Sequence, residues 1–491
     1  MSADPEIPLQ TDKRERLGEL QILSSSLEPD SAARRNALSG VAEYTESFLE
    51  GVRTRSVFQA PGDAAETLAA LRISEGAGSV EQALGLLHEH VTTVGQNLGS
   101  DRFFAYIPSG GLYPSALADF LGAVVNRYAG VGFAAPGAAR LEQSLLNWLA
   151  EMFGYPAAAD GDLTSGGSIS ALSAIVAARE ARGINSRNVS RTTVYLTAQT
   201  HHSFHKALHI AGMGECVMRY VPMDSSLRMN ADELQRMIDE DREAGLEPWL
   251  IAASAGTTDV GAVDPLDAIA DIASTSGTWF HVDAAYGGAF ALCEEGKKRL
   301  SGLQRSDSLI FDPHKGFFLP SGSGVVLIRD GDLLRKAFHT RGTYMQDAAG
   351  DPERSACDLS PELTRPFRGL RLWLPFKLLG IAPFRAALEE KLLLAEYFRD
   401  EMSQHQNCEL GPGPDLSIAT FRFLPAKGDV NDFNRRLVNE LRADGKIFIT
   451  STTIDGKFTI RMAILGYNTH LASVDTAIST IREKAAALMA E

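Results

Sequence analysis

A lysine stands at the end of a predicted buried strand in the stretch SLIFDPHKGFFLPSGSG, residues 308–324. The apolar run Leu309–Phe311 is followed by Asp-Pro-His-Lys, which ends at Lys315, and then by a glycine. A lysine amine held at a sheet edge can act as a nucleophile and bond covalently to a ligand. The stretch therefore predicts a reactive amine at Lys315, and the simpler alternative is a strand that runs out into a polar loop.

An aspartate ends the predicted strand that precedes this one, in the stretch WFHVDAAYGG. A carboxylate at the end of an apolar strand is costly to desolvate unless a cation lies beside it. The small residues Ala284 and Ala285, and Gly287 after them, leave room for a bulky flat ligand. Asp283 is therefore predicted to hold the cationic part of such a ligand.

A glycine–serine turn comes earlier, in LTSGGSISALSAI, residues 163–175. Backbone N–H groups and hydroxyls at a helix N-terminus bind phosphate, so Gly167 and Ser168 are candidate phosphate contacts. The turn matches neither GxxxxGK[ST] nor GxGxxG. An ordinary turn capped by Ser168 is the alternative.

Histidines and threonines follow two more predicted strands. In AQTHHSFHKALH, His201, His205 and His209 are four residues apart, but HExxH is absent and the stretch has no carboxylate, so we predict no metal site. His205 and His209 are interpreted as a solvated helix face. His201 comes at the strand end, where a flat ring can lie over a ligand. Thr257, in SAGTTDVGAVDPL, adds a hydroxyl at the same sheet edge.

These four features together suit pyridoxal 5′-phosphate. Lys315 would form the Schiff base, Asp283 would keep the pyridine nitrogen protonated, His201 would stack on the ring, and the helix N-terminus would take the phosphate. Ligands of open α/β sheets bind at the carboxyl ends of the strands, which is where all of these residues are predicted to lie.

Strands alternate with helices over the part of the chain that must position these residues. This alternation predicts an α/β fold with a mostly parallel, helix-covered sheet. We expect a mobile N-terminus and helical segment in residues 1–95, a large domain in 96–380 and a smaller α+β domain in 381–491. The predicted strands are Thr193–Thr197, Val217–Val221, Trp249–Ala253, Thr278–Val282, Leu309–Phe311 and Gly324–Ile328.

Composition limits the class of protein. The 491 residues carry a net charge of −15, which disfavours nucleic acid and anionic membranes as partners. The 4 cysteines form no CxxC pair, and the N-terminus lacks the apolar stretch of a signal peptide. No apolar run is long enough to span a membrane. We therefore expect a cytoplasmic protein.

The motifs resemble those of the group II pyridoxal-phosphate-dependent decarboxylases, which include aromatic-L-amino-acid, histidine and glutamate decarboxylases. The likeness runs from about residue 35 to about residue 485. Its stretches are RFFAYIPSGGLYPSALADFL, LEQSLLNWLAEMFGYP, TSGGSISAL, THHSFHKA, AGTTDVGAVDPL, HVDAAYGG, FDPHKG and FRGLRLWLPFKLLG.

The resemblance implies a type I cofactor fold, a homodimer with sites at the subunit interface, and α-decarboxylation of an L-amino acid to an amine and carbon dioxide. It assigns the cofactor roles above to Lys315, Asp283 and His201. It also places His314 and Ala285 beside the cofactor. The remaining implied contacts are Gly167 and Ser168 with the phosphate, Thr257 with the cofactor, Ser109 with the substrate, and Tyr344, on a mobile loop, as the proton donor to the α carbon.

The chain departs from the family at several positions. Asp312 stands where the aromatic and glutamate branches carry asparagine, and a second anion there would repel the phosphate. The aromatic branch has phenylalanine at Ile107, isoleucine and phenylalanine at Ala129 and Val131, and tryptophan near Leu98. The substrate is therefore left open.

Three alternatives share the scaffold. The first is decarboxylation coupled to oxidative deamination, which yields an aldehyde. In that branch the tyrosine or the stacking histidine is often replaced, so Tyr344 and His201 favour the amine-forming reaction. The others are a retro-aldol carbon–carbon lyase and a cofactor-binding protein without activity, and the intact Lys315 and Asp283 disfavour the latter.

Overall fold

The computed structural model describes residues 7–108, 110–340 and 353–491. The chain divides into two compact units, Met1–Asn97 and Leu98–Glu491. The first unit is mainly helical, and two of its helices begin with a side-chain cap: Asp30 accepts from the N–H of Ala33, and Ser79 accepts from the N–H of Gln82. Its elements are α1 (Ile7–Ser24), α2 (Ser31–Gly51), β1 (Phe58–Gln59), α3 (Ala64–Ala70), α4 (Val80–Leu87) and β2 (Gly95–Gln96), and β1 pairs antiparallel with β2. The sequence did not predict α1, because its apolar residues lack helical periodicity.

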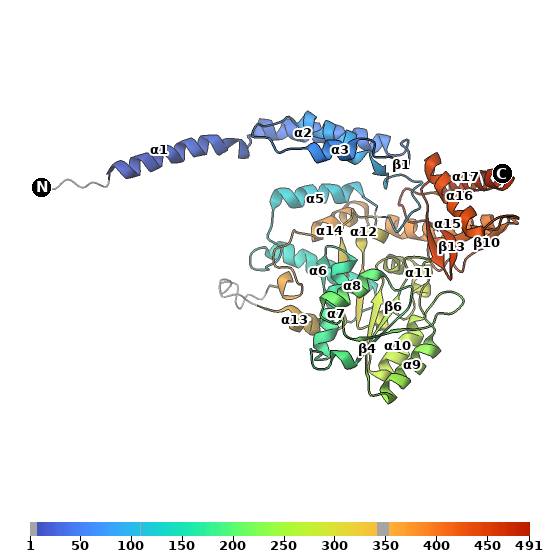
Figure 1. The fold of residues 1–491 in the computed structure, drawn as a ribbon. Coiled ribbons are helices and arrows are strands. Elements are labelled where there is room, and N and C mark those ends of the chain that lie inside the picture. The colour runs from blue at the N-terminus through green and yellow to red at the C-terminus, as the bar shows by residue number, and fades with distance from the viewer. Residues whose placement is uncertain (1–6, 109, 341–352) are drawn as a thin grey trace. The chain divides into compact units, whose positions relative to one another are not determined.

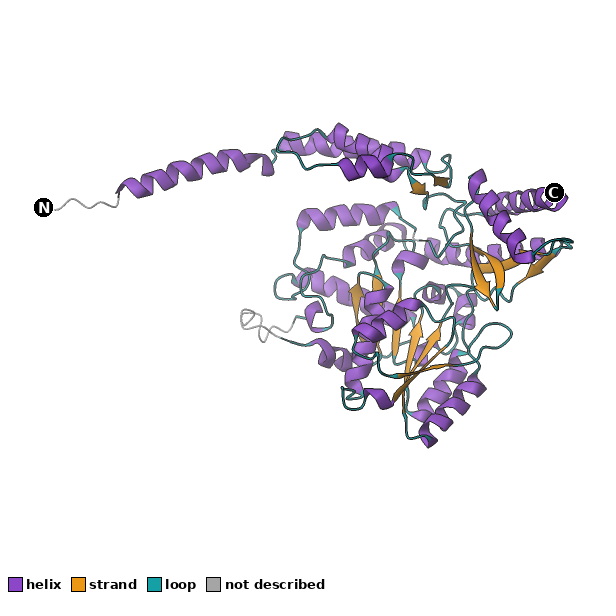
Figure 2. Cartoon of the chain, viewed as in Figure 1, coloured by secondary structure: helices purple, strands orange, loops and turns teal. Residues whose placement is uncertain are grey.

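A seven-stranded sheet forms the centre of the second unit (Figure 2). The strand order is β3-β9-β8-β7-β6-β4-β5. The strands from β8 through β5 run parallel, and β9 pairs antiparallel with both β8 and β3. The strands are β3 (Asp160–Thr164), β4 (Thr192–Leu196), β5 (Val217–Tyr220), β6 (Glu247–Ser254), β7 (Trp279–Asp283), β8 (Ser308–Phe311) and β9 (Gly324–Ile328). The predicted mostly parallel sheet is confirmed.

Strand β3 was missed because its residues, Asp-Gly-Asp-Leu-Thr, carry no apolar run. Tertiary contacts stabilise it instead. The buried side chain of Arg365 pairs with the carboxylates of Asp162 on β3 at 2.5 Å and of Glu142 on helix α6 (Pro136–Met152) at 2.9 Å. The backbone N–H of Gly369 also donates to Glu142. This buried cluster of ions fixes the segment after residue 352 against the sheet edge.

Helices cover both faces of the sheet (Figure 1). Alternate residues of the strands point to opposite faces, so Val194 and Leu196 pack with α7, α8 and α13 while Tyr195 packs with α6, α9 and α10. Such a two-sided cover explains why the strands read as nearly continuous apolar runs. The helices are α5 (Tyr113–Val125), α6 (Pro136–Met152), α7 (Gly167–Ala181), α8 (His202–Ile210), α9 (Ala231–Glu243), α10 (Leu266–Ser276), α11 (Glu294–Arg299), α12 (Pro313–Gly316), α13 (Gly331–Phe338) and α14 (Gly369–Leu379).

A smaller antiparallel sheet follows near the C-terminus, in the order β10-β11-β13-β12. Its helices share a core of their own with the inner face of the sheet. The elements are α15 (Ala382–Ser403), β10 (Cys408–Leu410), β11 (Ile418–Phe423), α16 (Val430–Asp444), β12 (Thr450–Ile454), β13 (Lys457–Ala463) and α17 (Leu471–Ala490). None of the helices in the described residues is both long and apolar enough to cross a membrane.

Candidate active site

A cavity of about 390 Å³ lies at the carboxyl ends of the parallel strands. This is the edge at which the sequence predicted a ligand. The structure brings eight of the ten predicted site residues to its wall: Gly167, Ser168, His201, Thr257, Asp283, Ala285, His314 and Lys315. Ser109 and Tyr344, which complete the set, lie outside the described residues.

Lys315 projects into this cavity from α12, a short helix that starts directly after β8. Its Nζ lies 3.0 Å from Oδ2 of Asp312, which is buried. Pro313 at the first position of α12 has the backbone angle a helix needs, so the chain turns at once from strand to helix. The turn places the amine above the strand end, within reach of a ligand in the cavity.

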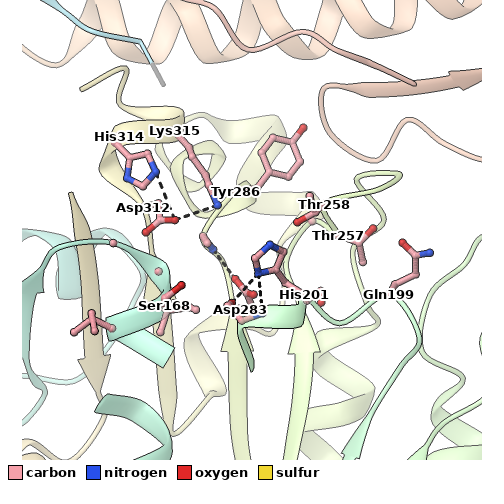
Figure 3. A pocket seen from close by; sticks show the side chains of 18 of the residues that line it. Ser168, Gln199, His201, Thr257, Thr258, Asp283, Tyr286, Asp312, His314 and Lys315 are labelled. Atoms are coloured by element: carbon pink, nitrogen blue, oxygen red, sulfur yellow. Dashed lines mark hydrogen bonds and ion pairs between the residues drawn. The ribbon is translucent and has the colours of Figure 1, made fainter. Parts of the chain in front are cut away.

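The imidazole of His314 is oriented by a hydrogen bond to a backbone carbonyl. Its Nδ1 donates to the carbonyl of Ser323 at 2.5 Å, and its Nε2 lies 3.9 Å from Oδ2 of Asp312. Figure 3 shows Lys315 and His314 both directed toward Asp312. Two basic side chains therefore converge on a single carboxylate.

His201 and Asp283 lie together on the other side of the cavity (Figure 3). Nδ1 of His201 accepts from the backbone N–H of Ser203 and lies 2.7 Å from its hydroxyl, so a neutral ring carries its proton on Nε2. Burial lowers the pKa of His201, and the nearby charge of Asp283 acts in the opposite direction. The ring therefore favours the neutral form. Asp283, at the end of β7, accepts from the N–H of Ala285 at 3.0 Å.

The N-terminus of α7 forms a third wall. Gly166, with φ +144° and ψ 173°, adopts a conformation essentially restricted to glycine, and among the described residues no side chain caps the helix. The first-turn N–H groups of a helix have no partner inside it. A Cβ on Gly167 would lie 2.9 Å from Oδ2 of Asp312, so only glycine leaves room for this carboxylate beside the helix end. The wall suits an anion.

Residues from the small sheet support the wall that carries Thr257. The hydroxyl of Thr257 accepts from the N–H of Ala262 at 3.1 Å, and the guanidinium of the buried Arg461, on β13, donates to the carbonyl of Thr258 at 2.7 Å. Arg461 donates also to the carbonyl of Tyr106 at 2.9 Å. One arginine thus connects this loop with the segment that precedes Ile107.

Several cavity residues were not predicted as site residues. Gln199 follows β4 as His201 does, so its place at a strand end was the available signal. Tyr286 carried no local signal, because its hydroxyl bonds to Ser417, a residue remote in sequence. The others are Ser165, Gly166, Ile169, Ser203, Ser254, Gly256, Thr258, Ile310 and Asp312.

The donor set fits pyridoxal 5′-phosphate. The open first turn of α7 fits the phosphate, the amine of Lys315 the aldehyde, the carboxylate of Asp283 the protonated pyridine nitrogen, and the ring of His201 the flat face. The charge of Asp312 beside Gly167 opposes the phosphate.

Comparison with known proteins also indicates a pyridoxal-dependent enzyme. The family model described as the pyridoxal-dependent decarboxylase conserved domain matches residues 61–424. An aromatic-L-amino-acid decarboxylase of Bacillus atrophaeus is 33% identical over 81% of this chain and 84% of its own length. A phenylacetaldehyde synthase of Arabidopsis thaliana is 32% identical over 79% of this chain and 83% of its own length. A crystal structure of Oryza sativa TDC with PLP and tryptamine superposes with a TM-score of 0.88 and 26% identity, covering 94% of this chain and 99% of that one.

Proposed function

The chain belongs to the pyridoxal-dependent decarboxylases, and we propose that Lys315, Asp283 and His201 carry out its reaction, the α-decarboxylation of an L-amino acid to an amine and carbon dioxide. The observation that supports these roles is the convergence of amine, carboxylate and imidazole on one cavity at the strand ends. Pyridoxal 5′-phosphate, when bound, supplies an electron sink for the bond that breaks at the α carbon.

Each residue acts at a stated atom. Nζ of Lys315 would hold the cofactor at its aldehyde carbon, and the same amine lies where the amino group of a substrate must arrive. The carboxylate of Asp283 holds a proton on the pyridine nitrogen, and hydrogen bonding by the N–H of Ala285 keeps this carboxylate oriented. The neutral ring of His201, fixed by Ser203, covers the flat face of the site and excludes water.

Further contacts complete the proposed site. Gly167 and Ser168 offer backbone N–H groups to the phosphate, and Thr257 contacts the cofactor from the loop held by Arg461. His314 and Ala285 lie beside the cofactor. Two roles rest on the sequence alone: Ser109 contacts the substrate, and Tyr344 donates the proton to the α carbon.

Aldehyde formation is the second candidate function. The observation that favours it is the 32% identity to the phenylacetaldehyde synthase of Arabidopsis thaliana. Such a reaction consumes dioxygen and water and releases carbon dioxide, ammonia and hydrogen peroxide with the aldehyde. The presence of Tyr344 and His201 supports the amine-forming reaction over this one.

The substrate is proposed only as an L-amino acid. The relatives carry names of aromatic substrates, but Leu98, Ile107, Ala129 and Val131 depart from the aromatic branch. None of these four contributes to the wall of the described cavity. The described cavity therefore does not identify the side chain of the substrate.

We propose that the protein is a cytoplasmic homodimer. Helix α5 exposes Leu117, Phe120, Leu121, Val124 and Val125, an apolar face that a second copy would cover. The four cysteines are free thiols, as expected in a reducing compartment. Light scattering should give twice the chain mass, and a monomer would contradict the dimer.

We propose also that residues 96–380 act as the cofactor domain and 381–491 as a supporting domain.

One experiment tests the function. The purified enzyme, loaded with cofactor, is incubated with each of the twenty common L-amino acids while carbon dioxide, amine, ammonia and peroxide are measured together. Equal amounts of carbon dioxide and amine without peroxide support decarboxylation. If peroxide and ammonia form in amounts equal to carbon dioxide, the enzyme forms an aldehyde instead of an amine. If no substrate releases carbon dioxide, both proposed reactions are contradicted.

A further inference from the structure

Asp312 is a buried carboxylate of the cavity that the proposed reaction does not use. It precedes α12, but its side chain caps none of the N–H groups of that helix. Its Oδ2 instead pairs with Nζ of Lys315 at 3.0 Å. Its Oδ1 is buried without a hydrogen-bond partner in the described residues. A buried carboxylate with one oxygen that accepts no hydrogen bond is costly unless positive charge lies close to it.

The N-terminus of α7 provides that position. The two oxygens of Asp312 lie 2.9 Å and 3.3 Å from the place where a Cβ of Gly167 would be, at the first residue of this 15-residue helix. The positive end of a helix dipole attracts a negative charge there. The carboxylate therefore lies beside the same helix end that we assign to the cofactor phosphate.

We propose that Asp312 is a positioning residue that holds the ammonium of Lys315 at the N-terminus of α7 before the cofactor binds and that weakens retention of the cofactor through its phosphate. This inference rests on the proposed function, since it takes α7 and Lys315 as the cofactor site. Two anions compete for one helix end, so the phosphate binds against the charge of Asp312. The enzyme then exchanges its cofactor more readily than it would with a neutral amide at this position.

A second effect of Asp312 must be separated from this one. By pairing with the amine of Lys315, the carboxylate also affects the covalent bond that the amine makes with an aldehyde. That effect is the same for pyridoxal 5′-phosphate and for pyridoxal, which lacks the phosphate. Repulsion of the phosphate changes the affinity for the ester alone.

The experiment compares the two aldehydes on the apoenzyme. Wild type, Asp312→Asn and Asp312→Ser are titrated with pyridoxal 5′-phosphate and with pyridoxal, and binding is followed by visible absorption and by tryptophan fluorescence. Asp239→Asn is the matched control, because it removes one negative charge from the exposed face of α9 far from the cavity wall. Circular dichroism checks that each variant is folded.

We expect Asp312→Asn to lower the dissociation constant of pyridoxal 5′-phosphate at least about tenfold, which corresponds to about 1.4 kcal/mol. The constant for pyridoxal should change by less than about a third of that factor. Asp312→Ser should change the ratio of the two constants in the same direction, and Asp239→Asn should leave it unchanged. Inorganic phosphate should compete more strongly for the site in both Asp312 variants.

Three results would overturn this proposal. Equal tightening for both aldehydes would show that Asp312 acts on the amine and not on the phosphate. Unchanged or weaker binding of the phosphate ester would show that the carboxylate does not oppose it. Wild-type protein that gives no absorption band with either aldehyde would instead overturn the proposed function, so the two failures are distinguishable.

Discussion

Stability at acidic pH tests the environment of His281, which lies two residues before Asp283 on the same face of β7. The imidazole is fully buried and stacks on Phe204, with ring centroids 5.5 Å apart. Its Nδ1 lies 2.8 Å from the hydroxyl of Ser308, and its Nε2 has no hydrogen-bond partner in the described residues. A charged ring would leave a buried donor unsatisfied, so the folded state favours the neutral form.

The magnitude follows from the pKa of this group. Burial lowers the pKa of His281 from 6.5 to about 4, and the nearby charge of Asp283 opposes the change only in part. As the pH falls below 6.5, the unfolded chain binds a proton that the folded chain binds only near pH 4. The contribution of the neutral His281 to the free energy of unfolding is therefore fully present above pH 6.5 and is lost as the pH falls. The loss is roughly 3 kcal/mol in total, of which about 2 kcal/mol is lost by about pH 5.

The assay compares wild type with His281→Phe, which keeps an aromatic ring against Phe204 but has no titratable group. Urea unfolding is followed by near-ultraviolet circular dichroism at about pH 7 and about pH 5, at one protein concentration. Between these two conditions, wild type should lose about 2 kcal/mol more apparent stability than the variant. His209→Gln, which replaces an exposed imidazole, is the control and should keep the wild-type pH dependence.

Two outcomes would refute this reasoning. If His281→Phe loses as much stability as wild type on acidification, His281 does not resist protonation in the folded state. If wild type gains stability relative to His281→Phe between about pH 7 and about pH 5, the sign is wrong and the folded ring takes up the proton more readily than the unfolded one.

Three further predictions concern the site and its support. Lys315→Ala should abolish the visible absorption band of the Schiff base between protein and cofactor, together with the release of carbon dioxide, and a retained Schiff-base band would exclude Lys315 as the bonded amine. Tyr344→Phe should slow amine formation by about a hundredfold or more and shift product toward aldehyde, as measured by amine and peroxide together, while an unchanged rate and product ratio would remove this tyrosine from the mechanism. Arg365→Met should lower stability by about 3–5 kcal/mol in urea unfolding, because its two buried carboxylate partners would remain unpaired. The exposed Arg236→Met is the control for Arg365, and equal losses in the two variants would contradict the role of burial.

Much of the fold was predictable because the periodic signal was strong. Strand β4, for example, is an uninterrupted run that is buried on both faces, and it was predicted within one residue of its observed bounds. Strand β3 was not predictable, since Asp162 is tolerated inside the sheet only because Arg365 meets it from a distant part of the chain. The antiparallel direction of β9 was also invisible, because residue types do not record strand direction.

The site shows a similar division. Lys315, Asp283 and His201 were predicted to meet at one sheet edge and do line one cavity there, because each follows a predicted strand and parallel strands bring their carboxyl ends to one edge. Tyr286 and Arg461 could not be identified, because their hydrogen bonds join segments that are remote in sequence.

The sequence by itself determined which chemical groups this protein can use. It shows which strand ends carry an amine, a carboxylate and an imidazole, and which turn contains two adjacent glycines. These properties are local, so residue types and spacing express them. Only the tertiary structure decided the neighbours of each charge. Asp312 and Gly167 are far apart in the sequence, and most strands of the large sheet lie between them along the chain. The carboxylate of Asp312 nevertheless lies beside Gly167, the first residue of α7, and pairs with Lys315. Electrostatic interactions depend on distance in space and on burial, and the order of strands in the folded sheet sets both.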